Sequence, residues 1–130
     1  MKFGYTIVYV ENVNQTVAFF NEVFELATRF VHESGDYAEL ETGTTTLAFA
    51  SHSLGDANFK DGFTRLVELD RPAGVEIALV TEEVERYFSR ATSAGAVELA
   101  PPSEKPWGQT VAYVKTADGI LIELCTPMGG

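Results

Sequence analysis

The 130-residue chain has little cysteine, little positive charge and no long apolar run. Its single cysteine, Cys125, excludes an intramolecular disulfide and a thiolate zinc site, and it fits a reducing cytoplasm. Nine Lys and Arg face 19 Asp and Glu, and the formal net charge of −10 argues against nucleic-acid partners. No stretch approaches the roughly 20 apolar residues of a membrane span, and no signal-peptide pattern is present. We therefore expect an acidic, cytoplasmic protein without a membrane partner.

Recognisable catalytic motifs are also missing. The sequence contains neither a P-loop nor a dinucleotide-binding glycine motif, and no Ser-His-Asp or Cys-His set is legible. Only two histidines occur. His32 alternates with Phe30 and is expected on an exposed strand edge, whereas His52 follows a strand and is a candidate for hydrogen bonding to a ligand.

Hydrophobic residues make up 45% of the chain, which is enough to bury one domain core. In the first half, a β-branched and aromatic run predicts a strand, and Asn12 with Gln15 three residues on predicts a helix start. Phe20 and Phe24 lie on the apolar stripe of that helix. The prediction is therefore a strand at 5–10, a helix that begins at residue 13, and three further strands at 29–33, 37–41 and 45–50.

The second half shows the same order. A strand at 75–80 precedes a helix capped by Thr81, with Glu82 and Glu83 in its first turn. Further strands are predicted at 97–99, 109–115 and 120–125, with a loop at 101–106. Between the halves, residues 51–71 show no period and are predicted to form a surface loop, with a strand at 64–68.

The two halves form an internal repeat. A shift of about 71 residues superposes Tyr5 on Glu76 and overlays the two helices, and superposing Gly43 on Gly119 places Leu47 on Glu123. The chain is therefore predicted to be one domain, 1–130, with module one at 1–69, a linker at 70–74 and module two at 75–130.

The order of the predicted elements resembles that of the vicinal oxygen chelate superfamily, and two segments of the sequence resemble motifs of its members. The segments are the first strand and helix, from Tyr9-Val10-Glu11-Asn12-Val13 to Phe24-Glu25-Leu26, and the closing hairpin Asp118-Gly119-Ile120-Leu121-Ile122-Glu123-Leu124. The superfamily includes glyoxalase I, extradiol dioxygenases and bleomycin-binding resistance proteins. The resemblance implies an α+β fold in which two βαβββ modules form a mostly antiparallel cupped sheet with helices on its outer face. It also implies a homodimer.

The resemblance further implies a metal site at four equivalent strand positions, which are usually His or Glu. The matching residues are Tyr5, Leu47, Glu76 and Glu123. Only Glu76 and Glu123 are good ligands, so the set is incomplete. No cofactor is required by this interpretation, and the alternative is a bound divalent metal such as Mg²⁺ or Mn²⁺. Without a metal, repulsion between the two carboxylates in one cup should raise the pKa of at least one of them.

Aromatic and polar residues are expected to line the same cup. The candidates for ligand binding are Tyr5, Phe49, His52, Trp107, Gln109 and Tyr113. An apolar cup with a few placed polar groups is typical of a small-molecule site. Trp107 has two interpretations, a plug in the core or dimer seam and a ring that stacks on a planar ligand.

Two functions follow from this interpretation. The first is a protein that binds a small organic ligand, with cationic ligands favoured by the acidity, similar to bleomycin-binding resistance proteins. The alternative is a divalent-metal-dependent lyase, isomerase or dioxygenase of the same superfamily. The absence of histidine at positions 5 and 76 favours ligand binding over metal-dependent catalysis. No catalytic residue is identified from the sequence.

Overall fold

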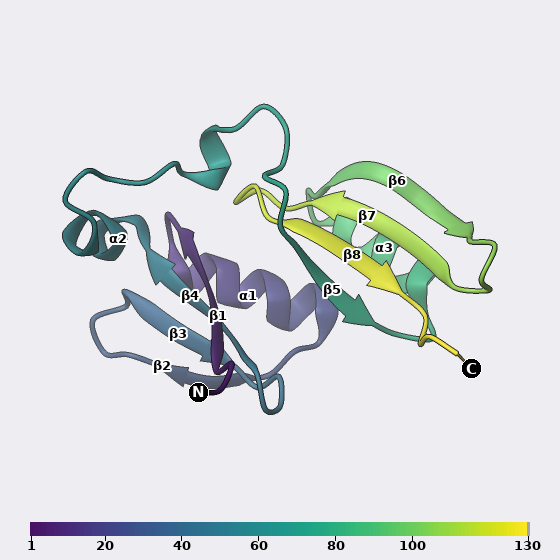
Figure 1. The fold of residues 1–130 in the computed structure, drawn as a ribbon, viewed down its shortest axis with the longest axis horizontal. Helices are drawn as coiled ribbons and strands as arrows, with labels where there is room; N and C mark the ends of the chain where they lie inside the picture. The colour runs from purple at the N-terminus through teal and green to yellow at the C-terminus, as the bar shows by residue number, and fades with distance from the viewer. Residues whose placement is uncertain (130) are drawn as a thin grey trace. The chain divides into compact units, whose positions relative to one another are not determined.

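The structure is a computed structural model that describes residues 1–129. It divides the chain into two compact units, Met1–Arg65 and Leu66–Gly130, each built around one sheet (Figure 1). The predicted linker at 70–74 falls inside the second unit, ahead of its first strand, and its role as a module boundary stays a prediction. In the described residues, no helix combines the length and apolarity that crossing a membrane requires.

The first unit is a four-stranded sheet with the order β1-β4-β3-β2. β1 pairs in parallel with β4, and the other pairs are antiparallel. Its elements are β1 (Tyr5–Val10), α1 (Val13–Phe24), β2 (Thr28–Val31), β3 (Tyr37–Leu40), β4 (Thr46–Ser51) and α2 (His52–Asn58).

The second unit repeats this topology with the order β5-β8-β7-β6. Its elements are a 3-10 turn η1 (Leu66–Glu68), β5 (Glu76–Val80), α3 (Val84–Ser93), β6 (Val97–Glu104), β7 (Thr110–Lys115) and β8 (Leu121–Cys125). β1 and β5, like α1 and α3, start 71 residues apart. The α+β class and the two βαβββ modules are therefore confirmed.

In the first unit, α1 covers one face of the sheet. Asn12 caps this helix, since its side-chain oxygen accepts the backbone N–H of Gln15 at 3.0 Å. The apolar stripe of α1 packs on β3 and β4, and the Phe20 and Phe49 rings lie 5.0 Å apart between centroids.

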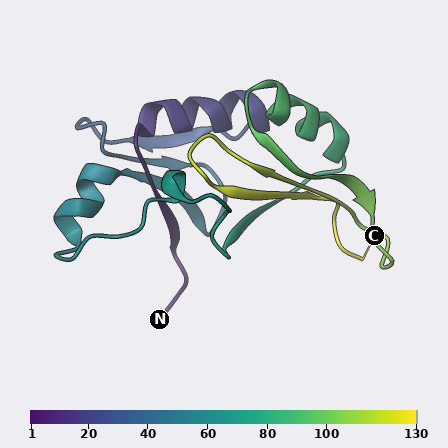
Figure 2. The same cartoon turned by 90° about the horizontal axis from the view of Figure 1, so that it is seen from above.

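Figure 2 shows α1 along the sheet, whereas α2 follows β4 and contacts β4 and β1. The face opposite α1 leaves Tyr5 and Ile7 exposed within this unit. Tyr9, on the same face, contacts Phe59 and Phe63.

The second unit has the same layering. α3 buries Val84, Phe88 and Ala91 and contacts β6, β7 and β8. Alternation along β8 buries Ile122 and Leu124 on this helix-covered face, which places Glu123 on the open face. Gly95 takes the left-handed conformation expected after the helix, with a φ of +103°.

Three local predictions are wrong. Residues 52–58 form a helix, because Ser51 caps it by accepting the Leu54 N–H at 3.1 Å. The predicted strand at 64–68 is a loop followed by η1. α3 begins at Val84, so Glu82 and Glu83 precede it, although the Thr81 hydroxyl does accept the Glu83 N–H at 3.0 Å.

The predicted loop at 101–106 is also wrong, because β6 continues to Glu104 through Pro101 and Pro102. β6 is the last strand of its sheet, so only one of its edges pairs. Its register against β7 shifts between Ala100 and Ser103, where the prolines lie. An edge position with a local bulge tolerates residues that lack an N–H.

Candidate functional site

The open face of the second sheet brings together two acidic side chains from neighbouring strands. In the β5–β8 register Ala78 lies opposite Glu123, and Glu76 lies two residues earlier on β5, on the same face. In the β7–β8 register Tyr113 lies opposite Glu123. The structure therefore brings together three of the predicted site residues, Glu76, Tyr113 and Glu123, which we call the carboxylate site.

The two carboxyl groups of this site differ in protonation. A hydrogen bond with Glu123, followed by desolvation and the Glu123 charge, raises the pKa of Glu76 to about 6. Desolvation works in the same direction at Glu123, but hydrogen bonds from Glu76, Tyr113 and Cys125 outweigh it and lower the pKa of Glu123. At pH values just below 6, Glu76 is therefore the member that holds the proton while Glu123 is ionised, as expected for a close pair of acids.

Two neighbours of Glu123 stay protonated beside it: Tyr113 donates to its carboxylate, and the Cys125 thiol lies 3.9 Å from the Leu79 carbonyl, to which it donates. The Tyr113 hydroxyl donates to Glu123 Oε1 at 2.8 Å, and this bond, with desolvation, raises the pKa of Tyr113 to about 12. Desolvation and the hydrogen bond to Glu123 raise the pKa of Cys125 to about 11, so its thiol stays protonated. The charge of Lys105 also lowers the Glu123 pKa, without an ion pair in the described residues. Lys105 was not predicted, because it comes from a turn whose approach to β8 depends on tertiary packing.

The equivalent face of the first unit carries different chemistry. Its register places Ile7 opposite Ala48 and Ala48 opposite Glu39. By strand register Ala48, and not Leu47, is therefore the counterpart of Glu123, and the predicted Leu47 equivalence is wrong by one residue. Leu47 is buried and alternates with Phe49 toward α1. Since neither residue can bind a metal, the set remains incomplete.

In this first unit an arginine neutralises the acids. Arg29 makes two hydrogen bonds of 3.0 Å to the two carboxylate oxygens of Glu41, and a third of 2.9 Å to the Thr46 hydroxyl. Its guanidinium also lies 3.7 Å from Glu39. The hydrogen bond from Arg29 lowers the pKa of Glu41, while desolvation and a hydrogen bond to Glu39 raise the pKa of Tyr37.

The remaining predicted residues lie elsewhere. Tyr5 is exposed at the start of β1, on the open face of the first sheet. Phe49 is fully buried against Phe20 on the helix-covered face, so its predicted place in the cup is wrong. His52 is buried at the start of α2, near the Phe63 ring.

Trp107 and Gln109 form a short hydrogen-bonded chain at the β6–β7 turn. The indole N–H of Trp107 donates to Gln109 Oε1 at 2.7 Å, and the Gln109 amide donates to the Thr126 carbonyl at 2.8 Å. Trp107 is 61% exposed, so it does not plug the core of its own unit. Gln109 holds the indole in place, and ligand contact by either residue stays a prediction.

The donor set of the carboxylate site does not fit the metal centre implied by the superfamily. It offers two carboxylates and a phenol, and no imidazole comes from either neighbouring strand. Among residues 1–129, no group of three His, Cys, Asp or Glu side chains is arranged to hold a metal ion. Zinc, nickel and iron sites normally use nitrogen ligands.

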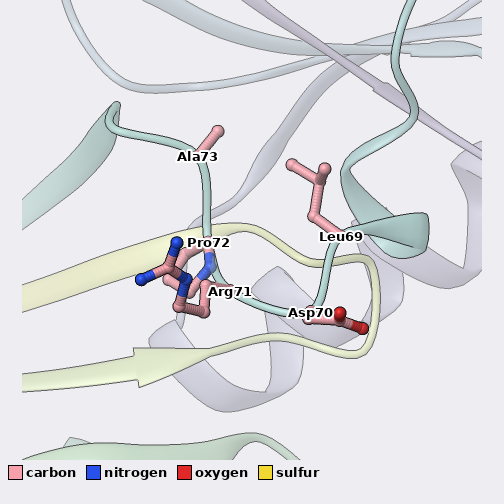
Figure 3. Close-up of a pocket in the computed structure, with 5 residues that line it drawn as sticks. All are labelled: Leu69, Asp70, Arg71, Pro72 and Ala73. Atoms are coloured by element: carbon pink, nitrogen blue, oxygen red, sulfur yellow. The ribbon is translucent and has the colours of Figure 1, made fainter.

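One open depression lies along the chain just before β5. It is lined by five consecutive residues, Leu69, Asp70, Arg71, Pro72 and Ala73 (Figure 3). The side chains of Asp70 and Arg71 point in different directions in this view. A single extended segment does not converge polar groups on one point, so this depression does not resemble a binding site.

Comparisons with known proteins agree with this architecture. Residues 3–129 match the glyoxalase-like domain family. A glyoxalase-related enzyme from Fulvimarina pelagi superposes with a TM-score of 0.81 at 18% identity, covering 98% of this chain and 88% of that one. A member of the glyoxalase/bleomycin resistance protein/dioxygenase superfamily from Sphaerobacter thermophilus gives 0.72 at 18% identity and covers 98% of both chains. A search of curated proteins finds no match.

The match to nearly the whole chain identifies its class. The protein belongs to the glyoxalase-like domain family, within the vicinal oxygen chelate superfamily. The solved structures are below 25% identity and support the fold alone. Because this fold hosts many chemistries, membership of the family does not by itself define the ligand or the reaction.

Proposed function

We propose that the protein binds and sequesters a small organic cation, with Glu76 and Glu123 as its anchor. The supporting observation is the pair itself, in which an ionised Glu123 meets a Glu76 whose pKa is raised to about 6. A positive group placed between them would remove the repulsion and release the Glu76 proton. Planar amidinium and guanidinium groups pair well with carboxylates because they donate parallel hydrogen bonds.

The first unit shows what such a cation does. There Arg29 occupies the neighbourhood of Glu39 and Glu41 and satisfies the Glu41 carboxylate in a bidentate manner. In the second unit, the described residues place no Arg or Lys in an ion pair with Glu76 or Glu123. A ligand cation would therefore supply at the carboxylate site the charge that the chain supplies itself in the first unit.

Titration with benzamidine tests the proposal, because this planar aromatic cation has a neutral analogue, benzamide. We expect calorimetry to show benzamidine binding that strengthens about fivefold or more from pH 5 to pH 7, as Glu76 loses its proton. Benzamide should bind no tighter at the higher pH. Glu123→Gln should abolish the preference for benzamidine, whereas Glu98→Gln, a matched change at an exposed acid of β6, should not.

Metal-dependent catalysis is the second candidate, because the two carboxylates, although too few to complete the metal centre of the superfamily, are oxygen ligands of the kind that Mg²⁺ and Mn²⁺ prefer. Melting curves with Mn²⁺, before and after EDTA, distinguish the two functions. A melting temperature raised by Mn²⁺, returned by EDTA and insensitive to benzamidine would replace the cation-binding proposal. Loss of both responses in Glu123→Gln would place the metal at the same site.

The proposal includes a homodimer. The open faces leave large apolar side chains uncovered within each unit, including Tyr5, Ile7 and Val80. Monomeric proteins rarely expose such patches, so a second chain is the simplest cover.

A further inference from the structure

Residues 52–65 fold into a compact segment on the end of β1, which we call the aromatic strap. It contains α2 and the loop that follows. The Tyr9 ring of β1 lies 5.0 Å from the Phe63 ring and 5.8 Å from the Phe59 ring, between centroids. An ion pair of 2.9 Å between Asp56 of α2 and Arg65 joins the helix to the far end of the loop. The strap is thus held by ring packing and one charge pair.

Gly55 allows the rings to pack directly on the α2 backbone. A Cβ atom at this position would lie 2.5 Å from Phe63 Cε1 and 3.0 Å from Tyr9 Cδ1. Those distances are below van der Waals contact, so any other residue would push the rings outward. The packing still leaves Phe59 exposed and Phe63 half-buried, so ring surface remains accessible to a further aromatic group.

His52 is a buried polar residue beside these rings. It is only 7% exposed, and its ring lies 6.0 Å from the Phe63 ring. Within residues 1–129 its imidazole has no hydrogen-bond partner. Yet no fully buried side-chain nitrogen or oxygen of the described residues lacks a partner. The imidazole nitrogens must therefore touch solvent, although nearly all of the residue is buried.

Because the His52 nitrogens reach solvent and have no protein partner among the described residues, a ligand can pair with them without first breaking a protein hydrogen bond. Two properties of the protein limit the chemical groups that could pair with the His52 imidazole. A neutral imidazole has one N–H donor and one acceptor nitrogen, and a hydroxyl group matches either of them. The net charge of −10 disfavours carboxylate and phosphate groups.

We propose that His52 is the hydrogen-bonding anchor of a subsite for a planar aromatic group that carries a hydroxyl. The ring of that group packs on Tyr9 and Phe63, and its hydroxyl pairs with the imidazole. This inference goes beyond the proposed function, because the subsite is defined by residues of the first unit alone and does not depend on the carboxylate site.

The probe is 2-naphthol, and 2-methylnaphthalene is its control because a methyl replaces the hydroxyl at similar size. With only two histidines in the chain, proton–carbon correlation spectra resolve the two imidazoles, and His32→Gln assigns them. We expect 2-naphthol to shift the His52 signals and leave those of His32 in place. His52→Phe should weaken 2-naphthol binding about fivefold and leave 2-methylnaphthalene binding unchanged.

His52→Gln provides a second variant that keeps a donor and an acceptor at this position. It should retain most of the preference for 2-naphthol, which a merely structural role of His52 would not predict. Absence of 2-naphthol binding, unshifted His52 signals, or equal weakening of both probes by His52→Phe would each overturn the subsite. Failure of benzamidine binding with 2-naphthol binding intact would instead overturn the cation anchor alone.

Discussion

Tyr113 and Glu123 are directly opposed in the β7–β8 register, and the phenol donates to the carboxylate at 2.8 Å. A charge-assisted hydrogen bond of this kind stabilises the ionised form of Glu123, so that Glu76 takes up the first proton as the pH falls through about 6. The asymmetry of the acid pair therefore depends on a residue from a third strand.

Removing that hydroxyl tests this dependence. Tyr113→Phe should raise the pKa of Glu123 and lower that of Glu76, because the proton is then shared more evenly. Carboxyl carbon-13 titration by NMR measures both values. Tyr37→Phe, which removes a phenol from Glu39 in the first unit, is the matched control and should leave the carboxylate site unchanged.

The Glu76 pKa also predicts how stability depends on pH. The pKa of Glu76 is about 6 in the folded protein and exceeds the ordinary value of 4.5. The contribution of protonated Glu76 to the free energy of unfolding is therefore fully present below pH 4.5 and is lost as pH rises through 6. Glu76→Gln should remove this loss and stabilise the protein near pH 7.5 by about 0.5 kcal/mol, a value discounted for exposure. Urea unfolding at pH 4.5 and 7.5 measures the difference. If Glu76→Gln were less stable than the wild type at pH 7.5, the raised pKa of Glu76 would be contradicted.

Gly119 should be intolerant of substitution. Its φ of +86° is in the left-handed region, and an added Cβ would lie 2.5 Å from the Leu66 carbonyl oxygen of η1. Both the conformation and the backbone contact oppose a side chain, so Gly119→Ala should cost about 2 kcal/mol or more. Gly43→Ala is the control, since it also has positive φ but open space around it. Thermal unfolding showing equal losses in the two variants would remove the role of the contact.

Assembly can be measured directly. Analytical ultracentrifugation at micromolar concentration should show a dimer, and the interface should bury on the order of 2,000 Å² or more. Val80→Glu, which charges an apolar side chain that is 63% exposed on the open face of β5, should shift the equilibrium toward monomer. A stable wild-type monomer would disprove this part of the proposal.

The architecture was predictable because its signals are local and repeated. Asn12 as a cap, the stripe from Val13 to Phe24, and the turn at Asp118-Gly119 each depend on residues close in sequence. Glu76 and Glu123 could be paired from the repeat and the resemblance together. The structure then places them on one face.

The errors came from properties that depend on pairing between strands. A one-residue slip in register exchanged Leu47 for Ala48, since neighbouring residues on a strand face opposite sides. The same alternation turns Phe49 toward α1. The aromatic strap was missed because its rings have no period in sequence, and their close packing on Gly55 depends on the tertiary structure.

The two prolines inside β6 have a consequence for how the second sheet can grow. Pro101 and Pro102 offer no N–H groups along the outermost strand, so an additional strand laid against that edge would find gaps in its hydrogen-bond ladder. Continuous sheet extension, which is a common route to aggregation, is thereby discouraged on this side. The opposite edge, β5, carries no proline. Any partner that associates with this sheet through backbone pairing therefore has one suitable border, and it is the one that begins with Glu76.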